Sequence, residues 1–333
     1  MNDELIHYYF DNEKLIMYSL YEVYKKNGYV SKKITKKNGS PRELLIPPSN
    51  LKSLQNKMLD ILQKYYFASG AVHSFIKSRG QDRRNIITNA SQHTEKYVVI
   101  SVDIENFFDS INFGRVRGFF LSYPFRMPEK IATCFAQMTT YKNKLPQGAP
   151  TSPIISNFIC HGIDNELNKL AKKDNLSYTR YADDIVVSSK KKLDNYEIGS
   201  ITNKIIKIIE TNGFKVNEKK TRVQFANQKQ IVTGLVVNKK VNVKKRYMKQ
   251  IRSMLHSWKT NGIDQAADKH FTLYNKQPKY HEDRAASFRA IVKGKINFLG
   301  QVKGYENHQY LKCKELFMLL DSQFTQSKKF KTL

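Results

Sequence analysis

The stretch TRYADDIVVSS, residues 179–189, places two consecutive acidic residues, Asp183 and Asp184, in a run that otherwise has the composition of a β-strand. We interpret it as two strands joined at Ala182–Asp183 or at Asp183–Asp184, a β-hairpin with the acidic pair at its tip. Taken alone, such a pair indicates either a solvated turn or a metal site.

A third carboxylate favours the metal site. The segment KYVVISVDIENFFDSI, residues 96–111, begins as a continuous β-branched run typical of a buried strand, and this run ends at Asp103. Three converging Asp side chains suit two-metal phosphoryl transfer, because Mg²⁺ prefers hard oxygen ligands. The sequence therefore predicts a site for two Mg²⁺ ions, which Mn²⁺ could replace.

The composition indicates a polyanionic partner. The chain has 333 residues, with 57 Lys and Arg against 29 Asp and Glu, a formal charge of +28. No stretch approaches the ~18 apolar residues of a membrane span, so we expect nucleic acid and no membrane. The N-terminus lacks the order of a signal peptide, and Cys134, Cys160 and Cys313 have no metal or disulfide spacing. We expect a cytoplasmic protein.

Local signals predict the remaining elements. Residues 1–27 are helix-like, and residues 32–48 read as a basic hairpin with a turn at Asn38–Gly39. A helix starts at Thr151 or Ser152, and another closes at Gly213. The basic tail after residue 243 has a helical apolar stripe.

The segments VDIENFFDSI (102–111), LPQGAPTSP (145–153) and YADD (181–184) resemble the catalytic motifs of reverse transcriptases, in the order usual for that family. The resemblance extends over most of the chain, from residue 41 to residue 238. Two further segments, NASQH (89–93) and VTG (232–234), resemble signatures of bacterial retron reverse transcriptases.

The resemblance implies roles for matching positions in catalysis. Asp103 and Asp183 match the principal metal ligands, Asp184 the third carboxylate, and Ile104 a ligand through its backbone carbonyl. Lys220 matches a lysine that protonates the leaving pyrophosphate. Its neighbour Lys219 could have this role instead, and the alternative interpretation of Lys220 is a solvated lysine without a catalytic role.

Further positions match contacts to the incoming nucleotide. Phe108 matches the aromatic gate that occupies the space of a ribose 2′-hydroxyl, with core packing as the alternative. The other matches are Gln147, Ser152 at a helix start and Arg42, whose triphosphate role Lys36 or Lys37 could share.

RNA contacts are expected in three places. Asn89 and His93 either contact RNA or form local hydrogen bonds, and Thr233–Gly234 either positions RNA or allows a close backbone approach. The basic tail should contact the duplex backbone through Lys244, Lys245, Arg246, Lys249 and Arg252.

The resemblance implies an α+β right-hand polymerase fold. We expect an N-terminal helical extension over 1–27, fingers over 28–95, a palm with a small antiparallel sheet and helices over 96–240, and a basic helical thumb over 241–333.

For a retron enzyme, the resemblance implies RNA-directed DNA synthesis from dNTPs. A structured non-coding RNA would be template and primer, and synthesis would start from an internal guanosine 2′-hydroxyl. The products would be an RNA–DNA hybrid and branched RNA-linked DNA (msDNA), with an effector protein as partner in anti-phage defence. The alternatives are another bacterial reverse transcriptase, of the group II intron, diversity-generating or abortive-infection class, and a non-catalytic RNA-binding scaffold for an effector.

Overall fold

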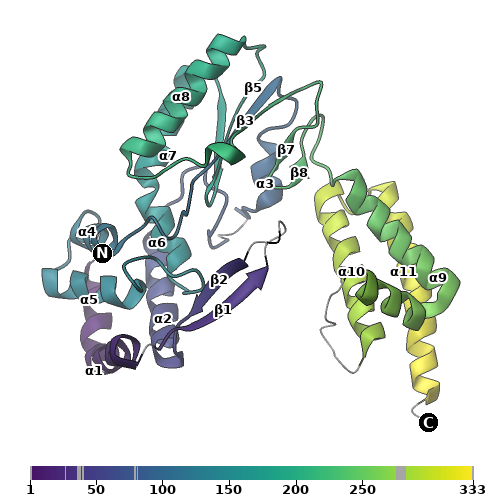
Figure 1. Cartoon of the computed structure of the whole chain (residues 1–333), viewed down its shortest axis with the longest axis horizontal. Coiled ribbons are helices and arrows are strands. Elements are labelled where there is room, and N and C mark those ends of the chain that lie inside the picture. Colours follow the sequence, from purple (N-terminus) through teal and green to yellow (C-terminus); the bar gives the residue numbers. More distant parts are fainter. Residues whose placement is uncertain are drawn as a thin grey trace. The chain divides into compact units, whose positions relative to one another are not determined.

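All three acidic residues lie in or beside one antiparallel sheet (Figure 1). Its strands are ordered β4 (Ser177–Tyr181), β5 (Asp184–Ser189), β3 (Val98–Asp103) and β6 (Arg222–Phe225). The hairpin of β4 and β5 is therefore found as predicted, and the strand predicted to end at Asp103 is central in the sheet. Strand β3 is almost entirely buried, which explains its continuous apolar run.

The structure is a computed structural model that describes residues 2–26, 28–35, 39, 41–78, 80, 82–274 and 283–331. It forms two compact units, residues 1–228 and 229–333. The predicted boundary between palm and thumb, at residue 240, falls inside the second unit. In the described part of the chain, no helix has the length and apolar character needed to cross a membrane.

Helices cover the sheet and build the core of the first unit. Helix α1 (Asn2–Lys26) packs against α2 (Ser49–Tyr65) through residues at helical spacing, of which Leu5 and Ile16 are fully buried. The remaining helices of this unit are α3 (Ile86–Ser91), α4 (Phe113–Leu121), α5 (Glu129–Thr139), α6 (Ser152–Ile159), α7 (His161–Lys173), α8 (Asn195–Thr211) and the 3₁₀ turn η1 (Glu218–Lys220).

The basic hairpin consists of β1 (Val30–Thr35) and β2 (Pro41–Ile46), paired from Val30 opposite Ile46 to Thr35 opposite Pro41. Of the predicted turn, Asn38 lies outside the described residues, as do Lys36 and Lys37.

Strand β2 is tied to the loop before α6. The N–H of Leu45 donates to the carbonyl of Gln147 at 2.7 Å. Gly148 has a φ of +129°, and a Cβ there would lie 2.7 Å from the Leu45 carbonyl oxygen. Only glycine fits this approach, because any side chain would collide with backbone.

The second unit is mostly helical. A short hairpin, β7 (Ile231–Val232) and β8 (Leu235–Val236), precedes α9 (Lys245–Tyr274), α10 (Arg284–Lys303) and α11 (His308–Lys331). Helix α9 has a non-helical residue, Gly262, at φ 76°. Trp258 joins the three helices, with its ring centroid 6.1 Å from that of Phe288 and 5.7 Å from that of Phe317. The predicted α+β class is confirmed.

Candidate active site

The register of the sheet brings two acids face to face. Asp103, the last residue of β3, pairs with Asp184, the first residue of β5. Directly opposed residues in an antiparallel pair have Cβ atoms about 4.5–5.5 Å apart and point to the same face. The N–H of Ile104 donates to the carbonyl of Asp183 at 3.1 Å, which ties the turn to the end of β3.

The tip of the hairpin is Ala182–Asp183. Tyr181 pairs with Asp184, which leaves these two residues as the loop. Of the two turn positions that the sequence left open, the first is therefore found. Ala182 has a φ of +57°, a left-handed conformation that is unfavourable for a residue with a Cβ.

The negative charges of the three Asp side chains repel one another at this turn. Desolvation by the surrounding protein and then the charge of Asp103 raise the pKa of Asp183. Desolvation and then the charges of Asp183 and Asp103 raise the pKa of Asp184 to about 6, although this residue as a whole is exposed. A cation placed among the three carboxylates would relieve this repulsion.

Lys220 supplies one positive charge. Its Nζ lies 2.7 Å from Oδ1 and 3.1 Å from Oδ2 of Asp103, whose side chain is 10% exposed. This hydrogen bond raises the pKa of Lys220. Of the two rival lysines, it is thus Lys220 that reaches an acidic residue of the site.

Of the residues predicted to act in catalysis or to contact the nucleotide, all but Asp184 and Ser152 line one cavity of about 520 Å³ in the first unit. Six separate segments contribute to it: β2, the residue Phe75, the end of β3 with the stretch after it, the loop before α6, the hairpin turn, and the stretch from Asn217 to the end of η1. The predicted residues in its wall are Arg42, Asp103, Ile104, Phe108, Gln147, Asp183 and Lys220.

An aromatic wall closes part of this cavity. Phe108 is half-buried, with its ring centroid 6.2 Å from that of Phe75, whereas Phe107 is a core residue that stacks on Phe214. Phe75 was not predicted as a site residue. Its only local signal is structural, a φ of +58°, which a sequence does not reveal.

Ser152 is not brought to the cavity. It is 1% exposed, and its hydroxyl donates to the carbonyl of Pro146 at 2.8 Å. The residue before α6 is Thr151, and the side chain of Ser152 stabilises the loop that enters the helix. The alternative interpretation, helix entry, describes this side chain.

Asn89 and His93 are both fully buried. The Nδ1 of His93 lies 2.7 Å from Oγ of Ser188, and its Nε2 lies 2.7 Å from Oγ1 of Thr179. His93 therefore connects the segment after α3 to both strands of the acidic hairpin. In this structure neither side chain faces a surface where RNA could bind, and the local alternative fits His93.

Thr233 and Gly234 form the two-residue turn between β7 and β8, with φ of +46° and +87°. A Cβ on Gly234 would meet no heavy atom within 4 Å. The glycine is therefore required by its backbone conformation and not by a close approach.

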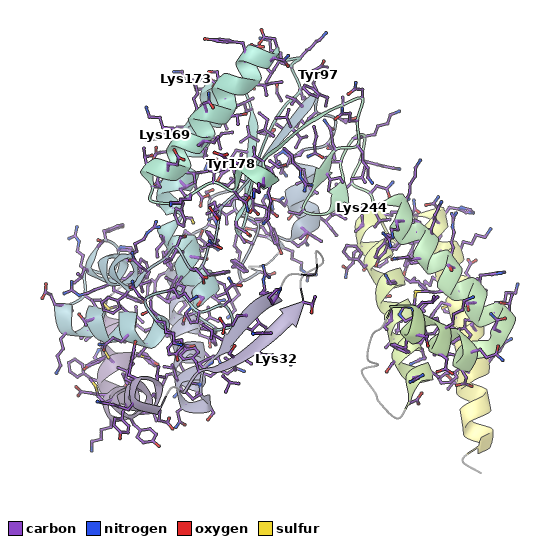
Figure 2. All side chains as sticks on the ribbon, viewed as in Figure 1. Lys32, Tyr97, Lys169, Lys173, Tyr178 and Lys244 are labelled. Carbon is purple, nitrogen blue, oxygen red and sulfur yellow. The ribbon has the colours of Figure 1, made fainter. Side chains whose placement is uncertain are left out.

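Positive charge is distributed over many elements. Figure 2 shows Lys32 on β1, Lys169 and Lys173 on α7, and Lys244 before α9, all of them exposed. The predicted tail residues Lys245, Arg246, Lys249 and Arg252 are exposed on α9.

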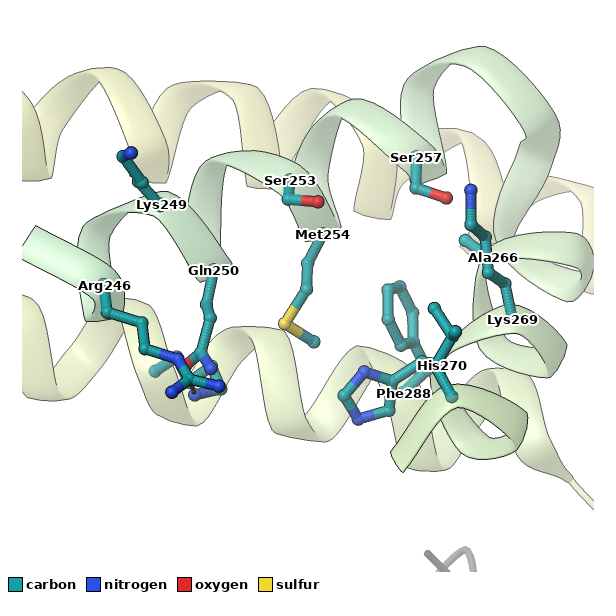
Figure 3. Close-up of a pocket in the computed structure, with 12 residues that line it drawn as sticks. Arg246, Lys249, Gln250, Ser253, Met254, Ser257, Ala266, Lys269, His270 and Phe288 are labelled. Carbon is teal, nitrogen blue, oxygen red and sulfur yellow. Dashed lines mark hydrogen bonds between the residues drawn. The ribbon is translucent and has the colours of Figure 1, made fainter. Parts of the chain in front are cut away.

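A second cavity, of about 490 Å³, lies within the helical unit. Arg246 and Lys249 line it together with two cations that were not predicted, Lys269 and Lys295. Figure 3 shows Arg246 at one end and Lys269 at the other, with Phe288 between them. These residues come from three helical segments, so their proximity has no signature in the sequence.

The donor set of the acidic cluster suits a divalent cation. The oxygens of Asp103, Asp183 and Asp184 are hard ligands of the kind that Mg²⁺ prefers. Within residues that the structure describes, however, no group of three His, Cys, Asp or Glu side chains forms a preformed metal cage. The three acids interact electrostatically, and Lys220 holds both oxygens of one of them.

Comparison with known proteins identifies similar chains. Residues 34–301 match a family model described as reverse transcriptase (RNA-dependent DNA polymerase). The chain is 32% identical over 269 residues to the retron Mx162 reverse transcriptase of Myxococcus xanthus, covering 72% of this chain and 54% of that protein. It is 31% identical over 220 residues to the retron Ec86 reverse transcriptase of Escherichia coli, covering 65% and 64%. The chain thus spans between half and two thirds of the length of these relatives.

The burial of His93 predicts a pH dependence of stability. Burial, and then the charges of Lys96 and His73, lower its pKa to about 3, whereas an unfolded histidine titrates near 6.5. Between these values the unfolded state binds more protons, so stability falls as the pH is lowered. From pH 7 to pH 5 we expect His93 to account for a loss of about 2 kcal/mol.

Urea unfolding at pH 7 and pH 5 measures this effect. His93→Gln should lose about 2 kcal/mol less than the wild type over this range. His161→Gln, at an exposed histidine of α7, is the matched control and should behave as the wild type. An identical pH dependence in His93→Gln and wild type would contradict the assignment of this effect to His93.

Proposed function

The chain belongs to the reverse transcriptase family, and on this basis we propose that it is an RNA-directed DNA polymerase, a nucleotidyltransferase that uses dNTPs. The resemblance to retron reverse transcriptases and the right-hand polymerase fold, both predicted from the sequence, are confirmed.

One observation carries the proposed activity: acidic, basic and aromatic side chains of six separate segments share the 520 Å³ cavity. Its volume is in the range of small-ligand sites, about 300–1,000 Å³. It combines carboxylates for metal, a guanidinium for phosphate and a ring beside them. A nucleoside triphosphate with its metal ions needs all three kinds of group.

We assign the roles as follows. Asp103, Asp183 and Asp184, with the Ile104 carbonyl, would hold two Mg²⁺ ions, and such ions would supply activation of the attacking hydroxyl and neutralisation of the pyrophosphate charge. Arg42, whose charge acts on Asp183, binds the triphosphate.

The remaining residues of the cavity orient the nucleotide, select its sugar and protonate the leaving group. Gln147 contacts the nucleotide from the loop that Leu45 holds, and Phe108 limits the space at the sugar. Lys220 protonates the leaving pyrophosphate, a role that rests on the match of its motif to the family.

We propose fingers from 28 to 95, a palm from 96 to 240 and a thumb from 241, with 1–27 as an N-terminal extension. The thumb binds the RNA backbone through the basic face of α9 and the cations of its cavity. His93 acts on RNA binding only indirectly, by supporting the hairpin through Ser188 and Thr179, and Asn89 is buried beside it. Thr233–Gly234 forms a tight turn that would position the RNA.

The finer function rests on the resemblance to retron enzymes. We propose that a structured non-coding RNA is template and primer, that an internal guanosine 2′-hydroxyl starts synthesis, and that the product is msDNA. An effector protein and a role in anti-phage defence belong to the same proposal. We also propose that the protein acts in the reducing cytoplasm. This agrees with its three buried cysteines, which form no disulfide: Cys134, Cys160 and Cys313.

Removing one carboxylate should separate chemistry from RNA binding. In Asp183→Asn we expect primer extension to fall by at least about 10³-fold, because a metal ligand is lost, while RNA affinity changes less than about twofold. Primer-extension assays measure the activity, and filter binding measures the RNA affinity. Asp60→Asn, at an acid on α2 with a 71% exposed side chain, is the control and should extend normally. Substantial extension by Asp183→Asn would refute the metal role.

Shortening the ring should relax sugar selection. Phe108→Val opens space beside the nucleotide, so we expect the preference for dNTPs over ribonucleotides to fall by about 10-fold or more. Single-nucleotide extension with each substrate provides the ratio within one variant. Phe119→Leu, at a ring of α4 outside the cavity lining, is the control and should leave the ratio unchanged. Unaltered discrimination in Phe108→Val would assign this ring to packing alone.

Thumb cations should contribute to the salt dependence of RNA binding. Each phosphate contact adds about 0.7–0.9 to the slope of log K against log salt. The double variant Arg246→Gln/Lys249→Gln should therefore reduce the slope by about 1.4–1.8. Lys259→Gln, an exposed α9 residue outside the cavity lining, is the control. A wild-type affinity that is independent of salt would contradict phosphate binding.

A further inference from the structure

The turn that carries Asp183 holds a backbone conformation that its own sequence disfavours. Ala182, directly before Asp183, has a φ of +57° and is 8% exposed. A left-handed conformation is unfavourable for alanine, because its Cβ approaches the carbonyl oxygen, and glycine is the residue that adopts it freely. Such a residue persists where the surroundings hold it in place.

Both backbone polar groups of Ala182 are held by buried side chains. Its N–H donates to Oγ of Ser74 at 2.7 Å, and its carbonyl accepts from Nη1 of Arg180 at 3.3 Å. The same Nη1 donates to Oδ1 of Asn157 at 3.1 Å, and Nδ2 of Asn157 donates to the carbonyl of Ser74 at 3.0 Å. The four residues thus form a closed ring of hydrogen bonds inside the protein.

Asp164 of α7 anchors this ring. It accepts from Nε and Nη2 of Arg180, each at 2.7 Å, and from the hydroxyl of Tyr178 at 2.6 Å. The side chains of Arg180 and Asp164 are 0% and 2% exposed. A buried ion pair of this kind is often no more stable than an apolar replacement, so stability alone does not account for it. The planar guanidinium of Arg180 does, however, form hydrogen bonds in fixed directions, which an apolar side chain could not do.

We propose that Arg180 is a positioning residue: anchored by Asp164, and together with Ser74 and Asn157, it holds the left-handed turn at Ala182 and so directs the Asp183 carboxylate toward the metal ions. The assignment rests on the proposed function, because that function gives Asp183 its metal.

Ser74→Ala is the sharpest variant, since it removes the acceptor of the Ala182 N–H and leaves the pair of Arg180 and Asp164 intact. Binding of Mn²⁺ to the full chain without RNA or dNTP, followed by electron paramagnetic resonance, reports on the site independently of turnover. We expect Ser74→Ala to weaken Mn²⁺ binding at least about fivefold. Arg180→Lys should weaken it further, because lysine lacks the fork that reaches both Asp164 and the turn.

Two matched variants separate positioning from general stability. Adding Ala182→Gly to Ser74→Ala should restore most of the affinity, because glycine adopts this turn without support. Tyr178→Phe removes a hydrogen bond to the same Asp164 but does not touch the turn. It should lower the melting temperature and leave Mn²⁺ affinity within about twofold.

The outcomes are distinct. Unchanged Mn²⁺ affinity in Ser74→Ala, no recovery with Ala182→Gly, or an equal loss in Tyr178→Phe would overturn the positioning role. Wild-type Mn²⁺ binding that Asp183→Asn abolishes, without any primer extension, would refute the polymerase and leave the positioning role standing. No Mn²⁺ binding by the wild type would overturn both.

Discussion

The pairing of β3 with β5 is the constraint on which the site depends, because it sets Asp103 opposite Asp184. Side chains alternate between the faces of a sheet, so a shift of one residue would turn one acid away from the other. On the opposite face, Val102 pairs with Ile185 in the core. The same shift would remove one of them from the core, so hydrophobic burial maintains the register that the carboxylates need.

The hairpin is held by polar contacts on both faces. Arg180 meets Asp164 of α7 on one face, and Thr179, the preceding residue, meets His93 on the other. Apolar packing stabilises the sheet without directing a turn, whereas hydrogen bonds in a low dielectric are directional and strong. This arrangement explains why a region next to a cluster of acids contains so many buried polar side chains.

The sequence predicted the elements that carry the acidic residues better than it predicted which polar residues are buried around them. The acidic hairpin and the buried strand that ends at Asp103 are found, and Arg42, Phe108 and Gln147 line one cavity. For polar residues the motif alone did not distinguish a surface role from an interior one. Asn89, His93 and Ser152 are inside because the elements around them cover them, and the role of Asp164 as an anchor had no local signal.

By itself, the sequence determined the order of the motifs, the strands and helices that apolar periodicity specifies, and the excess of positive charge. These properties depend on near neighbours along the chain or on composition. The tertiary structure alone decided which partners meet: Lys220 with Asp103 across 117 positions, His93 with Thr179 across 86, and Phe75 with Phe108. Such contacts depend on how distant elements pack against one another, and local propensity carries no information about that packing.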